Sequence, residues 1–259
     1  MHRSELNIDP SRPKTRMRPL KALRHMKTLI ADKEDTEQVF HIIEALSGDA
    51  LRRNLYRFAE TEEGEAALKE RTYLPPRLDD RGWLRELPDN TVGAAYVKFM
   101  EREGLTAQGL VDESMKMRQR YEDYNDDLSW YADRTRDTHD LYHVLTGYGR
   151  DALGEASLLA FTHGQMPSRG VNFISYVGTR EMKKHLPREA NVMECYREGK
   201  RNGRAAKTIA AEDIMALLRE PLEEARARLN IAKPVAYRNA LRVFDDAGMV
   251  ATDIQVAAE

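Results

Sequence analysis

The chain has 259 residues, of which 32% are charged, and its formal net charge is −2. This composition is typical of a soluble globular protein, and the nearly balanced charge excludes a bulk attraction to nucleic acid. The single cysteine, Cys195, excludes an intrachain disulfide and indicates a reducing compartment. No apolar run approaches the roughly 18 residues that a membrane span needs, and we recognise no secretory signal.

Residues 10–31 are basic and contain no acid; the basic residues are Arg12, Lys14, Arg16, Arg18, Lys21, Arg24 and Lys27. Apolar side chains recur at helical spacing among them, at Leu20, Leu23, Met26 and Leu29. Such a segment either lies on an anionic membrane surface or packs its apolar side chains on the protein's own core. A mitochondrial presequence is disfavoured, because Glu5 and Asp9 are acidic.

Apolar residues at helical spacing continue through most of the chain. One helix is expected over residues 39–46, ended by Gly48, a second over residues 51–58 and a short third over residues 66–68. Residues 74–90 contain three prolines and predict a long irregular loop.

The remaining pattern is helical as well. Further helices are expected over residues 91–103, around 110–115, and over 129–148, 154–166, 172–182 and 213–229. Pro221 suits a first helical turn, and strand candidates are short at most. The predicted fold class is therefore all-α, with no repeat and no clear internal boundary.

The segment around His139 and His143 carries the clearest chemistry. At positions i and i+4 of a helix, the two imidazoles stand on the same face and can bind one divalent ion. The arrangement follows the logic of the zincin helix, with Asp140 where the zincins have glutamate. Asp140 is the residue that helix geometry supports least as a ligand, because position i+1 points about 100° away from His139. It could instead orient an imidazole or carry a proton.

A further ligand is expected from Glu155, twelve residues beyond His143. Three intervening glycines allow the chain to fold back, and Glu155 shares a helical face with apolar residues. A carboxylate on such a face needs a partner, which a cation would supply. Alternatively, Glu155 could cap its own helix, and Asp140 could be a surface acid.

The chain resembles the ubiquinone (coenzyme Q) biosynthesis protein 4 family, which is marked by His-Asp-x-x-His, eleven residues and Glu. The resemblance extends to flanking segments at residues 87–93 with Tyr96 and Phe99, 203–207 and 221–231. It covers roughly residues 35 to 232. These limits define a helical metal-binding core at residues 35–232, a basic N-terminal arm at residues 1–34 and a C-terminal tail at residues 233–259.

The resemblance implies a metal bound by His139, Asp140, His143 and Glu155, with His139, Asp140 and His143 as the catalytic residues. The mixed nitrogen and oxygen ligands suit zinc first, and iron, cobalt or manganese otherwise. The implied partners are a polyprenylated aromatic lipid, other ubiquinone-biosynthesis proteins and the membrane surface, and a homodimer is one further arrangement. The implied location is the inner membrane, on its cytoplasmic side in a bacterium or its matrix side in a mitochondrion.

Two functions follow from the resemblance. One is a metal-dependent decarboxylase/hydroxylase that replaces the C1 carboxyl of a polyprenylated 4-hydroxybenzoate derivative by a hydroxyl; the sequence shows no flavin or nicotinamide motif. The other is a non-catalytic scaffold that binds a prenyl lipid and holds a structural metal. A third interpretation, an HD-type phosphohydrolase, would need an upstream histidine such as His41 and a downstream aspartate, and the spacing from His143 to Glu155 fits it poorly.

Overall fold

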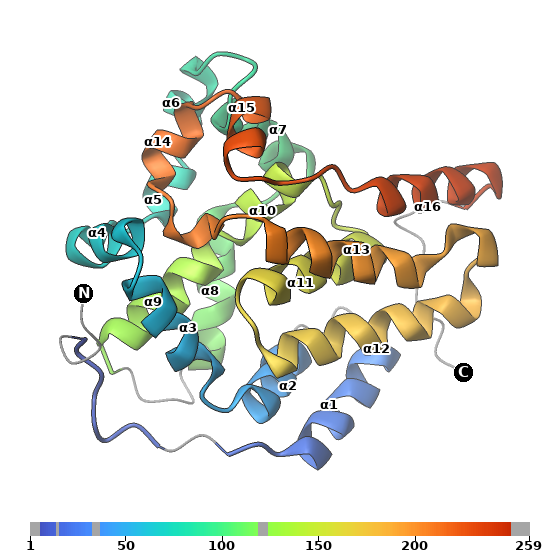
Figure 1. The fold of residues 1–259 in the computed structure, drawn as a ribbon, viewed down its shortest axis with the longest axis horizontal. Coiled ribbons are helices and arrows are strands. Elements are labelled where there is room, and N and C mark those ends of the chain that lie inside the picture. The colour runs from blue at the N-terminus through green and yellow to red at the C-terminus, as the bar shows by residue number, and fades with distance from the viewer. Residues whose placement is uncertain (1–5, 14–15, 33–36, 119–123, 250–259) are drawn as a thin grey trace. The chain divides into compact units, whose positions relative to one another are not determined.

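The computed structural model describes residues 6–13, 16–32, 37–118 and 124–249, and helices dominate them (Figure 1). No strand occurs in these ranges, where the only strand-like pairing is an isolated antiparallel bridge between Thr91 and Pro221. The all-α class expected from the sequence is confirmed. The chain divides into two compact units.

The first unit consists of Met1–Lys14, Leu51–Leu145 and Thr208–Leu229. Its helices are α3 (Ala50–Ala59), α4 (Glu62–Glu70), α5 (Pro75–Leu78), α6 (Arg81–Glu86), α7 (Val92–Arg102), α8 (Ala107–Arg118), α9 (Asp127–Asp137), α10 (His139–Thr146), η3 (Ile209–Ala211), α14 (Ile214–Arg219) and α15 (Leu222–Arg228).

The second unit consists of Thr15–Ala50, Thr146–Lys207 and Asn230–Glu259. Its helices are α1 (Pro19–Ala31), α2 (Glu37–Ser47), α11 (Ala152–Gln165), α12 (Arg169–His185), η2 (Arg188–Ala190), α13 (Val192–Ala205) and α16 (Val235–Asp246).

The prediction of one irregular loop over residues 74–90 is wrong, because two short helices form there. Pro75 begins α5, where the missing N–H of a proline costs no intrahelical hydrogen bond. The Asp80 carboxylate accepts a hydrogen bond from the backbone N–H of Trp83 and so caps α6.

Two helices that the sequence predicts as continuous are each divided. The helix expected over residues 129–148 breaks at Thr138, whose hydroxyl donates to the Arg134 carbonyl at 2.9 Å. The helix expected over residues 213–229 breaks at Pro221, which has no N–H to donate and holds Glu220 in an extended conformation. His139 is consequently the first residue of its own helix, α10.

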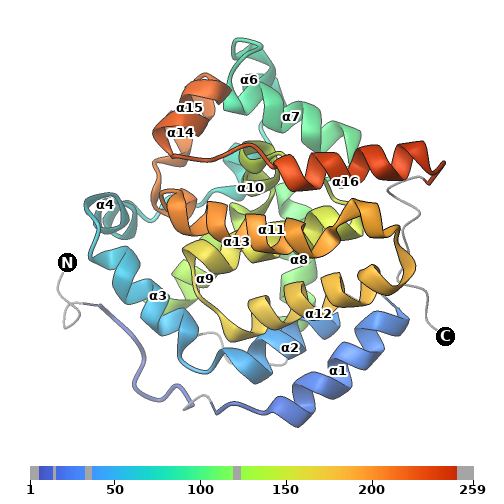
Figure 2. The ribbon, with the colours of Figure 1, turned by 45° about the vertical axis from the view of Figure 1, so that its right-hand side comes forward.

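Helices α11 and α13 of the second unit lie side by side in Figures 1 and 2. Glycines make this approach possible: a Cβ atom on Gly203 would lie 2.0 Å from the Phe161 carbonyl oxygen, and one on Gly199 would lie 2.5 Å from that of Ser157. Phe161 of α11 and Ile174 of α12 are buried core residues of this unit.

The N-terminal residues enter both units. In the first unit, Arg12 donates to both carboxylate oxygens of Asp126 at 2.6 Å, beside the start of α9. In the second unit, α1 lies along α2 (Figures 1 and 2), and Ala22 and Met26 are buried against it. Elsewhere on α1, Leu20 is 82% exposed and Leu23 is 49% exposed.

Residues 235–246, in the stretch that the sequence assigned to a tail, form the helix α16. The Glu198 carboxylate accepts the Ala236 N–H at 2.9 Å at the start of this helix. The Tyr237 hydroxyl accepts the Gly149 N–H at 3.1 Å and donates to Asp151.

Among the described residues, no helix combines the length and the apolar character that crossing a bilayer requires.

Candidate metal centre

Helix α10 brings three candidate ligands together. His139, Asp140 and His143 each offer one ligand atom, and these atoms all lie within 4.8 Å of one another. His143 is 2% exposed and Asp140 is also buried, whereas the His139 side chain is 37% exposed. The group therefore has one side closed by protein and one side open to solvent at His139.

The three residues fit a divalent metal. Four tetrahedral ligands at about 2.1 Å from a zinc ion lie about 3.4 Å from one another. The Nδ1 atom of His139 and the Oδ1 atom of Asp140 are already 3.5 Å apart. The His139 and His143 rings stand edge to face with 5.1 Å between their centroids, so small side-chain rotations would bring both nitrogens to one ion. Two imidazoles and a carboxylate suit zinc, iron, cobalt or manganese.

Asp140 lies closer to the histidines than its position in the helix suggests. The side chains of two adjacent residues point about 100° away from each other in a regular helix. His139, however, begins α10, and its imidazole reaches the Asp140 carboxylate from there. The structure therefore places all three residues of the His-Asp-x-x-His motif within reach of a single ion.

Helix α7 supplies the wall behind His143. The Phe99 ring stacks on the His143 imidazole with 5.4 Å between centroids and 21° between planes. Tyr96, one turn earlier on α7, is also buried. In the sequence, both residues contribute only to the resemblance to the family, and no role at the metal site is predicted for either.

The two flanking segments that resemble the family meet next to these helices. Thr91 caps α7 with its side chain and pairs with Pro221. The Val92 N–H donates to the Glu220 carbonyl at 2.9 Å, and the Leu222 N–H donates to that of Asn90 at 2.8 Å. Segments that are distant in sequence thereby fix the start of α7 against the start of α15.

Arg226 of α15 connects this pairing to the metal-binding helix. Its guanidinium donates to the carbonyl oxygens of Val144 and Leu145, both at 2.9 Å. These carbonyls belong to the last turn of α10, where backbone acceptors have no partner within the helix. A positive charge at this end is also favoured by the helix dipole. Arg226 therefore holds α10 in place from its C-terminal end.

Glu155 belongs to α11 of the second unit, whereas the three residues of α10 belong to the first. Its Oε1 atom lies 3.9 Å from Nε of Arg150, and its side chain is 34% exposed. The cap of α11 is Asp151, which accepts the Leu153 and Gly154 N–H groups and which the sequence pattern did not predict. Glu155 as a metal ligand stays a prediction.

His41, which a phosphohydrolase interpretation would need, lies on α2. Its Nε2 atom is 3.2 Å from Glu37 and its ring centroid is 4.5 Å from that of His25. The residue thus belongs to a local cluster between α1 and α2 of the second unit.

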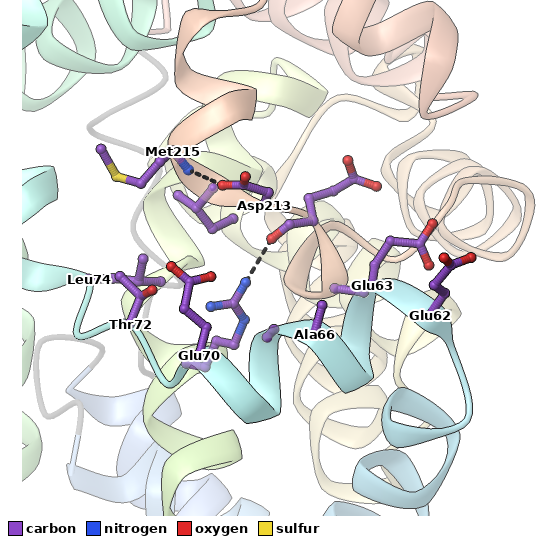
Figure 3. A pocket seen from close by; sticks show the side chains of 13 residues that line it. Glu62, Glu63, Ala66, Glu70, Thr72, Leu74, Asp213 and Met215 are labelled. Atoms are coloured by element: carbon purple, nitrogen blue, oxygen red, sulfur yellow. Dashed lines mark hydrogen bonds between the residues drawn. The ribbon is translucent and has the colours of Figure 1, made fainter. Parts of the chain in front are cut away.

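A separate hollow of about 400 Å³ lies in the first unit (Figure 3). Its lining combines apolar side chains with five acidic ones, which are Glu62, Glu63, Glu70, Glu212 and Asp213. Arg134, which also lines the hollow, is buried and donates to the Ala210 and Glu212 carbonyls. None of the His-Asp-x-x-His residues lines this hollow.

Residues 19–235 match the family described as Coenzyme Q (ubiquinone) biosynthesis protein Coq4. The chain belongs to this Coq4 family.

Curated Coq4 relatives are found in fungi. The mitochondrial ubiquinone biosynthesis protein COQ4 of Scheffersomyces stipitis is 29% identical over 191 residues, 73% of this chain and 57% of that protein. Its counterpart from Podospora anserina is 30% identical over 69% of this chain and 56% of that protein. The chain thus spans a little over half the length of the curated relatives it matches.

A solved structure shares the fold. It is the crystal structure of a proposed ubiquinone biosynthesis protein from Nostoc punctiforme PCC 73102, with a TM-score of 0.62 and 24% identity. The match covers 84% of this Coq4-family chain and all of the Nostoc chain.

Proposed function

We propose that this chain acts in ubiquinone biosynthesis as a metal-dependent enzyme that replaces the C1 carboxyl of a polyprenylated 4-hydroxybenzoate derivative by a hydroxyl. The observation that supports this proposal is the convergence of His139, Asp140 and His143 within 4.8 Å, inside the motif of a ubiquinone-biosynthesis family. Glu155 would complete the ligand set from α11. A scaffold with a structural metal is the alternative.

The proposed reaction needs an oxidant. Replacing carboxyl by hydroxyl removes two electrons from the substrate. With dioxygen as the oxidant, one dioxygen and one water are consumed, the bond between the ring and the carboxyl breaks, a ring C–O bond forms, and carbon dioxide and hydrogen peroxide leave. A bound divalent cation would stabilise the negative charge that develops on the substrate oxygens.

The protein's own residues would orient and protect this chemistry. Phe99 and the burial of His143 keep water away from one side of the site. The exposed side of His139 leaves an approach for the substrate ring. Asp140 would either bind the cation or carry a proton between the substrate hydroxyl and solvent. Zinc fits the ligands, but only iron, cobalt or manganese could change oxidation state.

The deciding experiment is incubation of the metal-loaded protein with a short-tailed prenylated hydroxybenzoate, with and without oxygen. Release of carbon dioxide and the product mass are measured. Activity should disappear in His143→Ala and persist in His185→Ala, a solvent-facing histidine on α12. Activity with iron but none with zinc would support a metal that changes oxidation state, and full activity with zinc would contradict it. No turnover under any condition would favour the scaffold.

The role of Glu155 is tested separately, by metal affinity. Glu155→Ala should weaken binding of zinc, measured in competition with a chelator. The matched control is Glu194→Ala on α13, whose carboxylate pairs with Arg197 and Arg201 on the surface. Equal affinities in the two variants would remove Glu155 from the ligand set.

We also propose that the second unit binds a membrane surface through α1. Leu20 and Leu23 are exposed one helical turn apart, and Arg24 and Lys27 are basic and exposed on the same helix. Apolar side chains flanked by basic ones favour an anionic bilayer. The double variant Leu20→Asp, Leu23→Asp should lose sedimentation with phosphatidylglycerol vesicles, whereas Tyr73→Asp, at an exposed tyrosine of the first unit, should keep it.

A further inference from the structure

The side chain of Tyr96 presents a buried hydroxyl that the fold does not use. Tyr96 is 1% exposed, and its hydroxyl oxygen has no hydrogen-bond partner among the described residues. Buried tyrosine hydroxyls are normally hydrogen-bonded, and leaving one without a partner costs roughly 1–3 kcal/mol. A group kept at such a cost calls for an explanation, such as a ligand that completes the hydrogen bond.

The position of Tyr96 indicates where that ligand binds. Tyr96 and Phe99 are three residues apart on α7, so their side chains lie on one face of the helix. The Phe99 ring on this face stacks on His143. Burial raises the pKa of Tyr96 well above its usual range, and the Asp140 carboxylate raises it further, more than any other charge does. The hydroxyl therefore stays protonated and lies near the candidate metal centre.

The other charged groups that act on Tyr96 already have partners of their own. The Asp79 carboxylate accepts the backbone N–H groups of Ala107 and Gln108, at 2.7 and 2.9 Å. Arg81 donates to the Leu105 carbonyl. Asp137 accepts both Nε and Nη2 of the neighbouring Arg136. None of these contacts uses the hydroxyl of Tyr96, which remains a neutral donor beside the motif.

We propose that the Tyr96 hydroxyl donates a hydrogen bond to an anionic oxygen of the molecule that binds at His139, Asp140 and His143. For the substrate, which rests on the proposed function, this oxygen belongs to the carboxylate or the ionised phenol. A buried donor of this kind selects for ligands that have the oxygen, because a ligand without it leaves the hydroxyl unpaired.

The first test is Tyr96→Phe, which removes only the hydroxyl. The melting temperature should be equal to or higher than that of the wild type, since no hydrogen bond within the protein is lost, and zinc affinity should be unchanged. Affinity for a short-tailed prenylated 4-hydroxybenzoate, measured by calorimetry on the zinc-loaded protein, should fall about tenfold or more. The matched control is Tyr131→Phe, another buried tyrosine of the first unit, which should bind as the wild type does.

A second readout does not depend on the substrate. With 3-fluorotyrosine placed at position 96, acetate added to the zinc-loaded protein should shift the fluorine resonance, and the same addition to the His143→Ala variant should not. A shift with acetate without binding of the prenylated acid would uphold the role of Tyr96 and reject the proposed substrate. An unshifted resonance, or unchanged ligand affinity in Tyr96→Phe, would overturn the inference about Tyr96.

Discussion

The Phe99 ring lies almost parallel to the His143 imidazole, with their centroids 5.4 Å apart. The Arg102 guanidinium also lies over the Phe99 ring, 5.4 Å from its centroid. The phenyl ring therefore contacts both a cation and an imidazole, and its stacking limits the rotation of His143. A ligand whose ring is fixed before a metal arrives loses less freedom on binding than a mobile one.

Replacing Phe99 by alanine should lower zinc affinity about tenfold, the effect typical of groups that orient a metal ligand. The measurement is zinc competition with a chelator, at a temperature where the variant is fully folded. The control is Phe244→Ala, which removes another buried phenyl ring, on α16, and should leave zinc affinity unchanged. A similar loss in both variants would mean that general loosening, and not the contact with His143, lowers the affinity.

Arg226→Lys should loosen α10 from its C-terminal end. Lysine keeps the charge, but its single ammonium cannot reproduce the two hydrogen bonds that the planar guanidinium donates to the Val144 and Leu145 carbonyls. The expected cost is about 1–2 kcal/mol of unfolding free energy, with faster hydrogen exchange in the last turn of α10. The exposed Arg242 of α16 offers the control, Arg242→Lys. Unchanged exchange in α10 of the Arg226 variant would contradict the anchoring role.

Two glycine-to-alanine changes should have opposite effects on stability. At Gly203 the new methyl group would meet the Phe161 backbone, so Gly203→Ala should destabilise the protein by about 1–3 kcal/mol. At Gly178 of α12 a Cβ atom meets nothing within 4 Å, and Gly178→Ala should stabilise by about 0.5–1 kcal/mol through helix propensity. Urea unfolding measures both. A stabilising Gly203→Ala would show that α11 and α13 are packed less closely.

Stability should fall in acid partly through Asp126. Burial by itself would raise its pKa, but the Arg12 guanidinium and the backbone N–H groups of Asp9 and Ser129 together hold it well below the usual range. Because the folded pKa lies below the unfolded value of about 4, this stabilisation is complete above that pH and declines as the pH falls further.

Arg12→Gln tests this contribution. The variant should lose about 2 kcal/mol of unfolding free energy at neutral pH, and the difference from the wild type should shrink as the pH falls below about 4. Urea unfolding at several pH values provides the measurement. Arg24→Gln, at an exposed position of α1, should show no such dependence. A difference that stayed constant into acid would exclude the ion pair as its source.

Local patterns in the sequence were sufficient for the helical class and for the shared face of His139 and His143, because both depend only on the 3.6-residue turn. They also located Gly48 at the end of α2, where its positive φ of 48° suits glycine. They failed at Thr138 and Pro221. There a side-chain hydrogen bond and a bridge to Thr91 divide segments whose apolar spacing is continuous.

The sequence by itself thus determined which residue types could bind a metal and which helix would present them. The tertiary structure alone decided what surrounds them: Phe99 against His143, Arg226 at the end of α10, and the unpaired hydroxyl of Tyr96. The contacts of Phe99 with His143 and of Arg226 with α10 join residues that are dozens of positions apart in the sequence. Helical periodicity records which face of a helix is buried, but not which partner buries it, and that choice is made by packing.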